Sequence, residues 1–272
     1  MVMQDHFQFY TPTSAGIRSL VSNFFYIRSS DPSFLREQMV LPYPQLTLGF
    51  FLKSPFQVKK GNGEQTIVRK YVFSRLSKDK VTIRPLSDEI EILGVNLKPF
   101  ALRTFTHLRA DQLEWHEDPQ RLFQKNVDQL YQEILLPGAI QERVNLLEDF
   151  LTKSVVNLPD PVTVRALEII HQNIFGDALS VKKLAEALNI SDRSLRNHFS
   201  KEIGLSPVDY LQLVRLHSAV NDMKGPLKKQ ADIYFDNNFF DQAHFIHAFK
   251  RIAEISPKKF QKQIAAFQYL QF

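Results

Sequence analysis

Three side chains with the hydrogen-bonding groups needed to recognise bases lie close together at Arg193, Arg196 and Asn197. An arginine can donate two hydrogen bonds to guanine, and an asparagine can both donate to and accept from adenine. On a helix, residues three or four positions apart are neighbours, so this spacing places the three side chains on one helical surface. The segment therefore predicts a helix that contacts base edges in the major groove of DNA.

The same segment is one copy of a repeat. The pattern of Ser191–Lys201 recurs fifty positions later in Asp241–Arg251, and a Ser-Pro pair follows each copy. Ser191 and Asp241 are expected N-caps, whose side chains accept hydrogen bonds from the unpaired N–H groups of the first helical turn. A short helix, a tight turn and a second helix with a polar face are typical of a helix-turn-helix, so we predict two such units.

An apolar pair in each copy is expected to anchor it to the preceding helix. The pairs are Leu195 with Phe199 and Phe245 with Phe249, each four positions apart and therefore on one helical face. The opposite face is left for DNA. A plain helical bundle with solvated polar faces could contain any one of these residues, but the duplication disfavours it. The candidates for base contact are Arg193, Arg196, Asn197, Gln242, Ala243, Ile246 and His247, and those for phosphate contact are Ser191, Lys201, Asp241, Lys250, Arg251, Lys258 and Lys259.

The elements around the repeat divide the chain into two domains. The segment 158–161 carries two prolines, which make a stiff, extended connection. We expect residues 1–157 to form a sensor and possible dimerisation domain, and residues 161–272 to form an all-helical DNA-binding domain. The latter holds 15 Lys and Arg against 11 Asp and Glu, which is most of the chain's net charge of +5. This imbalance is a mild indication of where a polyanion binds.

The sequence of the first domain predicts antiparallel strands followed by helices. Five segments rich in β-branched and aromatic residues are separated by turn signals, which predicts a barrel or a sandwich at about residues 5–110. Helical spacing then predicts a hairpin of two helices at about 118–156, divided at Leu136-Pro137-Gly138. The class is therefore α+β. The expected strands are 24–27, 46–52, 67–73, 81–83 and 90–97.

Several functions are disfavoured by what the sequence lacks. It contains no Cys, which excludes disulfides, thiol catalysis and Cys-ligated zinc. Histidines before residue 161 do not cluster, so we expect no metal site, no cofactor and no catalytic residue. The absence of a long apolar run and of a signal-peptide pattern predicts a cytoplasmic protein with no membrane partner.

The first domain is instead expected to hold a pocket for a small-molecule effector of unknown identity. Its aromatic candidates are Phe50, Phe51, Tyr71 and Phe73, although for any one of them a place in the core is the favoured alternative. Two other functions stay open: an enzyme acting on a small molecule with an accessory helical domain, and a protein that coats DNA without sequence preference. Metal analysis and competition with random DNA would separate these from a specific regulator.

Residues 164–263 resemble the DNA-binding domain of AraC/XylS-type regulators. The resemblance is carried by Ile190-Ser191, Gly204, Ser206-Pro207 and the segment 239–245 with its following Ser256-Pro257. It implies two recognition helices that enter successive major-groove segments of double-stranded DNA and are joined by a long helix. The chain departs from the pattern at three positions, which bear on the geometry of the second unit: Tyr234, Asn238 and Glu254.

The first domain is similar to the sensor domains of one AraC subgroup, through 40–50, 94–100 and 143–150. That resemblance implies a cupin-like β-barrel followed by helices. A homodimer and a contact with RNA polymerase are further possible partnerships of such a regulator, which the sequence does not decide.

Overall fold

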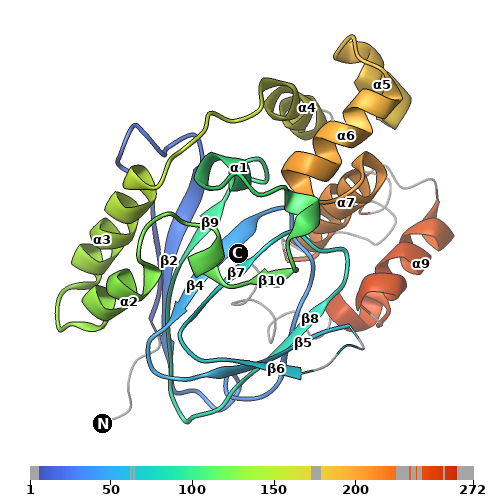
Figure 1. The fold of residues 1–272 in the computed structure, drawn as a ribbon. Helices are drawn as coiled ribbons and strands as arrows, with labels where there is room; N and C mark the ends of the chain where they lie inside the picture. Colours follow the sequence, from blue (N-terminus) through green and yellow to red (C-terminus); the bar gives the residue numbers. More distant parts are fainter. Residues whose placement is uncertain are drawn as a thin grey trace.

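The structure, a computed structural model, describes residues 6–61, 63, 65–172, 179–224, 233, 237, 241–253 and 255–261. Along this part of the chain, antiparallel strands with three α-helices and two short 3₁₀ helices come first, and a run of α-helices follows (Figure 1). This order agrees with the predicted α+β class and with an all-helical second half. Among the described helices, none has the length and apolar composition of a membrane span.

The larger sheet has six antiparallel strands and is buried on both sides at its centre. Every residue of its strand β9 is buried. Successive strand residues point to opposite faces. Phe24 and Tyr26 consequently lie in the core beneath the helices, whereas Phe25 and Ile27 face the second sheet. In spatial order the strands are β1 (His6–Tyr10), β2 (Val21–Ser29), β9 (Ile90–Leu97), β4 (Leu46–Phe51), β7 (Tyr71–Ser74) and β10 (His116–Glu117).

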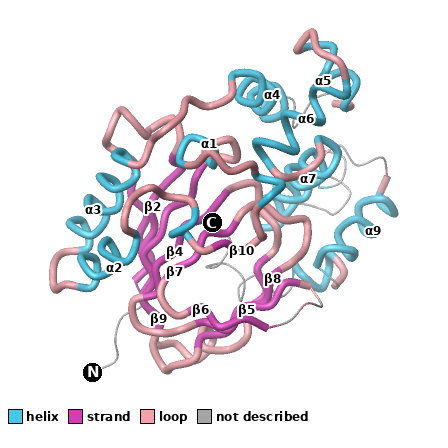
Figure 2. The backbone as a smooth tube through the Cα atoms, in the orientation of Figure 1, coloured by secondary structure: helices cyan, strands magenta, loops and turns pink. Residues whose placement is uncertain are grey.

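A second sheet of four antiparallel strands lies across the apolar layer from the first (Figure 2). The strands of the described residues thus hydrogen-bond into two sheets, and the predicted single cupin-like barrel is corrected to this arrangement. One expected strand, 67–73, is broken at residues 69–70, and its halves belong to different sheets. In order, the strands are β3 (Gln38–Val40), β8 (Val81–Pro85), β5 (Phe56–Lys60) and β6 (Gln65–Val68).

The predicted helical hairpin is present and covers the larger sheet on the face away from the second sheet. Helix α2 (Val127–Leu135) begins after Asn126, whose side chain accepts a hydrogen bond from the backbone N–H of Gln129 at 2.9 Å. Its partner α3 (Ile140–Lys153) packs beside it. Before the hairpin come the short helices α1 (Leu102–Phe105), η1 (Ala110–Gln112) and η2 (Pro119–Arg121).

The helices of the second half pack against the first half through a continuous core. This core runs from Leu48 and Phe73 in the sheet, through Ala110 of η1, to Leu195 and Tyr210. The predicted domain boundary therefore falls between α3 and α4 in the chain, while apolar packing continues across it. The helices are α4 (Pro161–Gln172), α5 (Val181–Ala187), α6 (Asp192–Ile203), α7 (Pro207–Lys224) and α9 (Gln242–Ala253).

Candidate functional site

Helix α6 has the polar face that the sequence predicts. It begins after Ser191, whose Oγ accepts a hydrogen bond from the backbone N–H of Ser194 at 3.1 Å. Leu195 and Phe199 are fully buried, and Phe199 makes an edge-to-face contact with Tyr210. Because these two residues fix one side of the helix, the other side is free for contacts outside the protein. Its exposed residues include Arg193, Arg196 and Asn197.

Helix α9 repeats this arrangement in the second unit. Phe245 and Phe249 are buried, and the Phe249 ring makes an edge-to-face contact with Phe260. The helix starts directly after Asp241, as expected for a capping residue. Ile246 is half-buried beside the core, so it has less surface to offer a base than predicted. The exposed candidates are Asp241, Gln242, Ala243, His247, Lys250 and Arg251.

Some of the phosphate candidates already make side-chain hydrogen bonds or ion pairs within the described part of the chain, and others do not. Lys250, Lys258 and Lys259 are exposed. Arg251 donates a hydrogen bond to Oε1 of Gln212 on α7 at 2.9 Å, so part of its guanidinium is occupied within the protein. Lys201 lies 3.6 Å from the carboxylate of Glu202.

Parts of the second unit lie outside the described residues. The sequence also predicts a helix over residues 228–236, and all of that stretch except Ile233, which is buried, lies outside them. The three departures from the family pattern, at 234, 238 and 254, lie outside them as well. In the described part, α6 and α9 lie on the same side of the sheets, with α7 between them (Figure 1).

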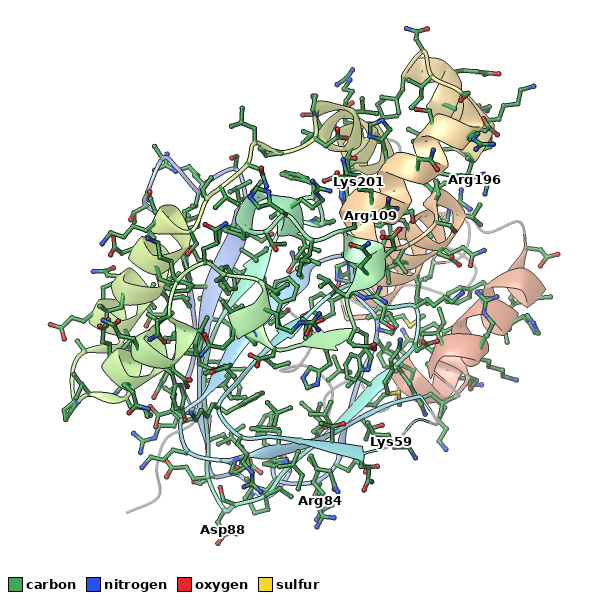
Figure 3. The ribbon with its side chains drawn as sticks, in the orientation of Figure 1. Lys59, Arg84, Asp88, Arg109, Arg196 and Lys201 are labelled. Carbon is green, nitrogen blue, oxygen red and sulfur yellow. The ribbon has the colours of Figure 1, made fainter. Side chains whose placement is uncertain are left out.

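The C-terminal end of α6 is fixed to the first half of the chain. The Ser200 hydroxyl donates a hydrogen bond to the carboxylate of Asp111 on η1, and Asp111 also pairs with Arg109 at 2.7 Å. In Figure 3, Arg196 projects from α6, whereas Lys201 lies toward the end of the helix that packs on η1, where Arg109 is labelled. Arg196 is therefore a better placed candidate for DNA than Lys201.

A cavity of about 170 Å³ lies between the two sheets. Of the four predicted effector residues, only Phe51 lines it. Phe50 and Phe73 are fully buried in the core on the other face of the larger sheet. Tyr71 packs against Tyr131 of α2 at 5.8 Å between ring centroids. These three residues do not line the cavity, because strand residues alternate between faces and the cavity lies on the face of their neighbours.

Two glycines pair on neighbouring strands beside the cavity, and one of them, Gly49, makes room for it. Gly94 of β9 lies beside Phe25 and Gly49 on its neighbouring strands. The Phe25 ring lies so close over Gly94 that a Cβ there would be 2.3 Å from the ring. A Cβ on Gly49 would meet no heavy atom within 4 Å among the described residues. The ring fills the space above one glycine, and the space above the other stays open.

The sole tryptophan and its neighbour form one wall of the cavity. The Trp115 and His116 rings stack with centroids 4.7 Å apart and planes 17° apart, and both line the cavity. The sequence showed these two residues as adjacent but contained no signal for this role. Among the described residues, no group of three or more His, Asp or Glu is arranged to hold a metal ion.

We predict that acid destabilises the protein through His116. Burial lowers the pKa of His116 to about 4, compared with about 6.5 for an unfolded histidine. Between these values the unfolded state binds a proton that the folded state excludes, so the free energy of unfolding should fall as pH drops from about 6.5 to about 4. Over this pH range, the free energy of unfolding measured with urea should change less with pH for His116→Gln than for the unmodified protein. Gln141→Ala, which alters an exposed side chain that does not titrate, should leave the slope unchanged.

Arg75 connects the cavity to α6. It lines the cavity, and its Nε donates to the Leu113 carbonyl at 3.0 Å. Its Nη1 donates to the carbonyls of Leu76 at 3.3 Å and Gly204 at 3.4 Å. Gly204 ends α6 in the left-handed conformation, with φ of 75°. The close approach of its backbone to Ala110 is a second reason for glycine, because a Cβ would be 3.0 Å from the Ala110 carbonyl oxygen.

Comparisons with known proteins place the helical half in a family. A helix-turn-helix domain model matches residues 184–263. The Msm operon regulatory protein of Streptococcus mutans is 33% identical over 113 residues, which are 42% of this chain and 38% of that protein. The transcriptional regulator MtrA of Neisseria gonorrhoeae is 28% identical over 87 residues, or 32% of this chain and 29% of that protein. Each match thus spans less than two thirds of the curated relative.

Solved structures resemble a larger part of the chain. A structure of ToxT from Vibrio cholerae has a TM-score of 0.55 at 10% identity, covering 88% of this chain and 97% of that one. A second ToxT structure, with a bound unsaturated fatty acid, has a TM-score of 0.53 at 13% identity, covering 90% and 96%. At this identity the likeness concerns the fold, which in both cases includes the strands and the helices. Residues 184–263 therefore match a helix-turn-helix domain, and the fold of the larger part of the chain resembles that of ToxT.

Proposed function

We propose that this chain is a sequence-specific DNA-binding transcription regulator that responds to a small-molecule effector. The observation that carries the proposal is the pair of helices α6 and α9, each held by a buried pair of residues and each exposing polar side chains on its other side. A free polar face on the second helix of a helix-turn-helix is the surface that enters the major groove. The matched relatives are regulatory proteins, which supports this function.

In this proposal the two helices contact successive segments of double-stranded DNA. Arg193, Arg196 and Asn197 contact bases in the first segment. In the second segment Gln242 and His247 donate or accept hydrogen bonds, and Ala243 and Ile246 contact thymine methyl groups. The cations on and after α9 contact phosphates and set the position of the protein on the duplex. A regulator of chromosomal genes acts in the cytoplasm.

Selection of DNA sites from a random library tests this function with the full chain. We expect an enriched site with two separated segments, bound at least about 10³-fold more tightly than random duplex. Site length and the presence or absence of a repeated half-site would also report whether a homodimer binds. Equal competition by random and selected DNA would instead identify a protein that coats DNA without sequence preference.

Lys250→Ala should weaken binding to every DNA sequence by a similar factor. Lys250 is exposed on α9 and has the chemistry of a phosphate contact, which depends on counterion release. We expect the slope of log affinity against log salt to become shallower by about 1. Fluorescence anisotropy at several salt concentrations measures this slope. Lys182→Ala, on the exposed side of α5, is the matched control; a change confined to one base pair would contradict the phosphate assignment.

We further propose that residues 1–157 sense the effector and residues 161–272 bind DNA. The cavity between the sheets is the proposed effector site. Arg75 supports this proposal because one guanidinium both lines the cavity and holds the end of α6. A second link is Leu41, which lines the cavity and packs in the same apolar cluster as Phe245 and Phe249 of α9. RNA polymerase is the partner that an activating regulator would contact.

A further inference from the structure

We infer that the cavity between the two sheets binds a compact, uncharged molecule with a single ring and an amide or hydroxyl group, which the Gln45 side chain orients. This inference rests on the proposed function only in calling the ligand an effector. The cavity and its chemistry are properties of the first half of the chain, so binding can be measured without DNA.

The volume of the cavity limits the size of its ligand. Its volume of about 170 Å³ is similar to the ~150 Å³ apolar cavity that holds one benzene molecule. A long-chain fatty acid such as oleate carries several times as many carbon atoms as benzene. A single ring with a small substituent therefore matches the space that this chain provides.

The walls favour a flat apolar ring. They include the side chains of Phe25, Phe51, Val58, Ile83 and Ile92, and the indole of Trp115. Aromatic rings contact one another favourably in stacked or edge-to-face arrangements. Above Gly49 the backbone itself forms the floor, which lets a flat molecule approach the sheet closely.

Gln45 supplies a polar group that the protein itself does not satisfy. Its Oε1 is buried and has no hydrogen-bond partner among the described residues, and Gln45 lines the cavity. The neighbouring hydroxyls are occupied, since Tyr43 bonds to Thr47 and Thr47 bonds to Asn96. A buried acceptor without a hydrogen-bond partner destabilises the folded protein. A ligand group that both donates and accepts, such as an amide or a hydroxyl, would satisfy the side-chain amide in either orientation.

Two charged groups that border the cavity, Arg75 and Asp79, already make contacts within the protein. Arg75 donates to three backbone carbonyls. Burial lowers the pKa of Arg75, and the nearby carboxylates of Glu114 and Asp111 oppose that shift. Asp79 pairs with Lys60 at 3.3 Å. Because three N–H donors of Arg75 are directed to the protein and Asp79 is paired, an ionised ligand would lose its hydration and gain only the remaining part of the Arg75 guanidinium in return.

The single tryptophan makes the test direct, because Trp115 fluorescence reports on the cavity. The full chain, without DNA, is titrated with benzamide, toluene, benzoate and oleate. We expect saturable quenching by benzamide, with a Kd at least about tenfold below those of toluene and benzoate, and no saturable change with oleate. Tighter binding of benzoate or oleate than of benzamide would overturn the inference.

Two variants test the polar group and the volume of the cavity separately. Gln45→Leu keeps the approximate volume and removes the amide, so benzamide should lose its advantage over toluene while toluene still binds. Gly49→Val should fill the cavity and abolish quenching by both compounds. Circular dichroism and urea unfolding confirm that each variant is folded, and Gln45→Met replaces Gln45→Leu if the latter is not. An unchanged benzamide Kd in the Gln45 variant contradicts the inference, and so does undiminished binding in folded Gly49→Val. Loss of DNA binding alone would bear only on the proposed function.

Discussion

Arg196→Ala is expected to reduce affinity for the selected DNA site by about 5- to 150-fold and to relax the preference at one base pair. A bidentate contact between arginine and guanine contributes about 1–3 kcal/mol of discrimination. Arg196 is exposed on α6, whereas Leu195 and Phe199 are the buried anchors, so its removal should leave the fold intact. Titration of the protein against the four versions of each base pair in the site measures the effect.

The matched control is Arg165→Ala on α4. Arg165 is also exposed and is paired only locally, with Glu168 at 2.9 Å, so the variant loses the same charge away from the recognition face. It should keep the base preference of the unmodified protein. If Arg196→Ala retained both affinity and preference, the assignment of this helical face to the bases would be wrong.

Phe199→Ala is expected to lower the free energy of unfolding by about 3–5 kcal/mol. Phe199 is fully buried, and its ring meets the Tyr210 ring edge-to-face with centroids 5.8 Å apart. Truncation removes a large apolar side chain and leaves a cavity beneath α6 that the surrounding helices cannot fill. Since a typical domain has only about 5–15 kcal/mol of stability, DNA binding should weaken as well, although Phe199 does not lie on the proposed DNA-binding face.

Urea unfolding followed by circular dichroism measures this loss. Phe9→Ala provides the control, because Phe9 lies on the edge strand β1 with 56% of its surface exposed. That variant should stay within about 0.5 kcal/mol of the unmodified protein. A loss for Phe199→Ala no greater than for Phe9→Ala would contradict the anchoring role given to the Leu195 and Phe199 pair.

The helical half could be predicted largely from residue spacing. An apolar pair four positions apart, a capping serine and a glycine at the end were sufficient to place α6, because a helix is specified by contacts within a few residues. The same local information predicted that Phe245 and Phe249 are buried. It could not tell that Arg251 would turn toward Gln212, a contact that depends on how α7 and α9 cross.

The sheet region was less predictable because strands pair over long distances. Alternation identified several strands but did not show which face of each would line a cavity. Phe50 and Phe51 are adjacent aromatic residues, yet one lies in the core and the other borders the cavity. Arg75 shows the same limit, since its contact with Gly204 joins residues 129 positions apart. The sequence around Arg75 and the sequence around Gly204 give no indication of this contact.

The packing of α6 on η1 has a consequence for protein engineering. Sensor and DNA-binding domains are often exchanged between regulators as independent modules, with the junction placed in the linker. In this chain Ala110 and Leu113 share one apolar core with Leu195 and Phe199. A chimera cut at residues 158–160 would bring foreign side chains against these surfaces. A functional exchange should therefore require η1 to be transplanted together with the helices it supports.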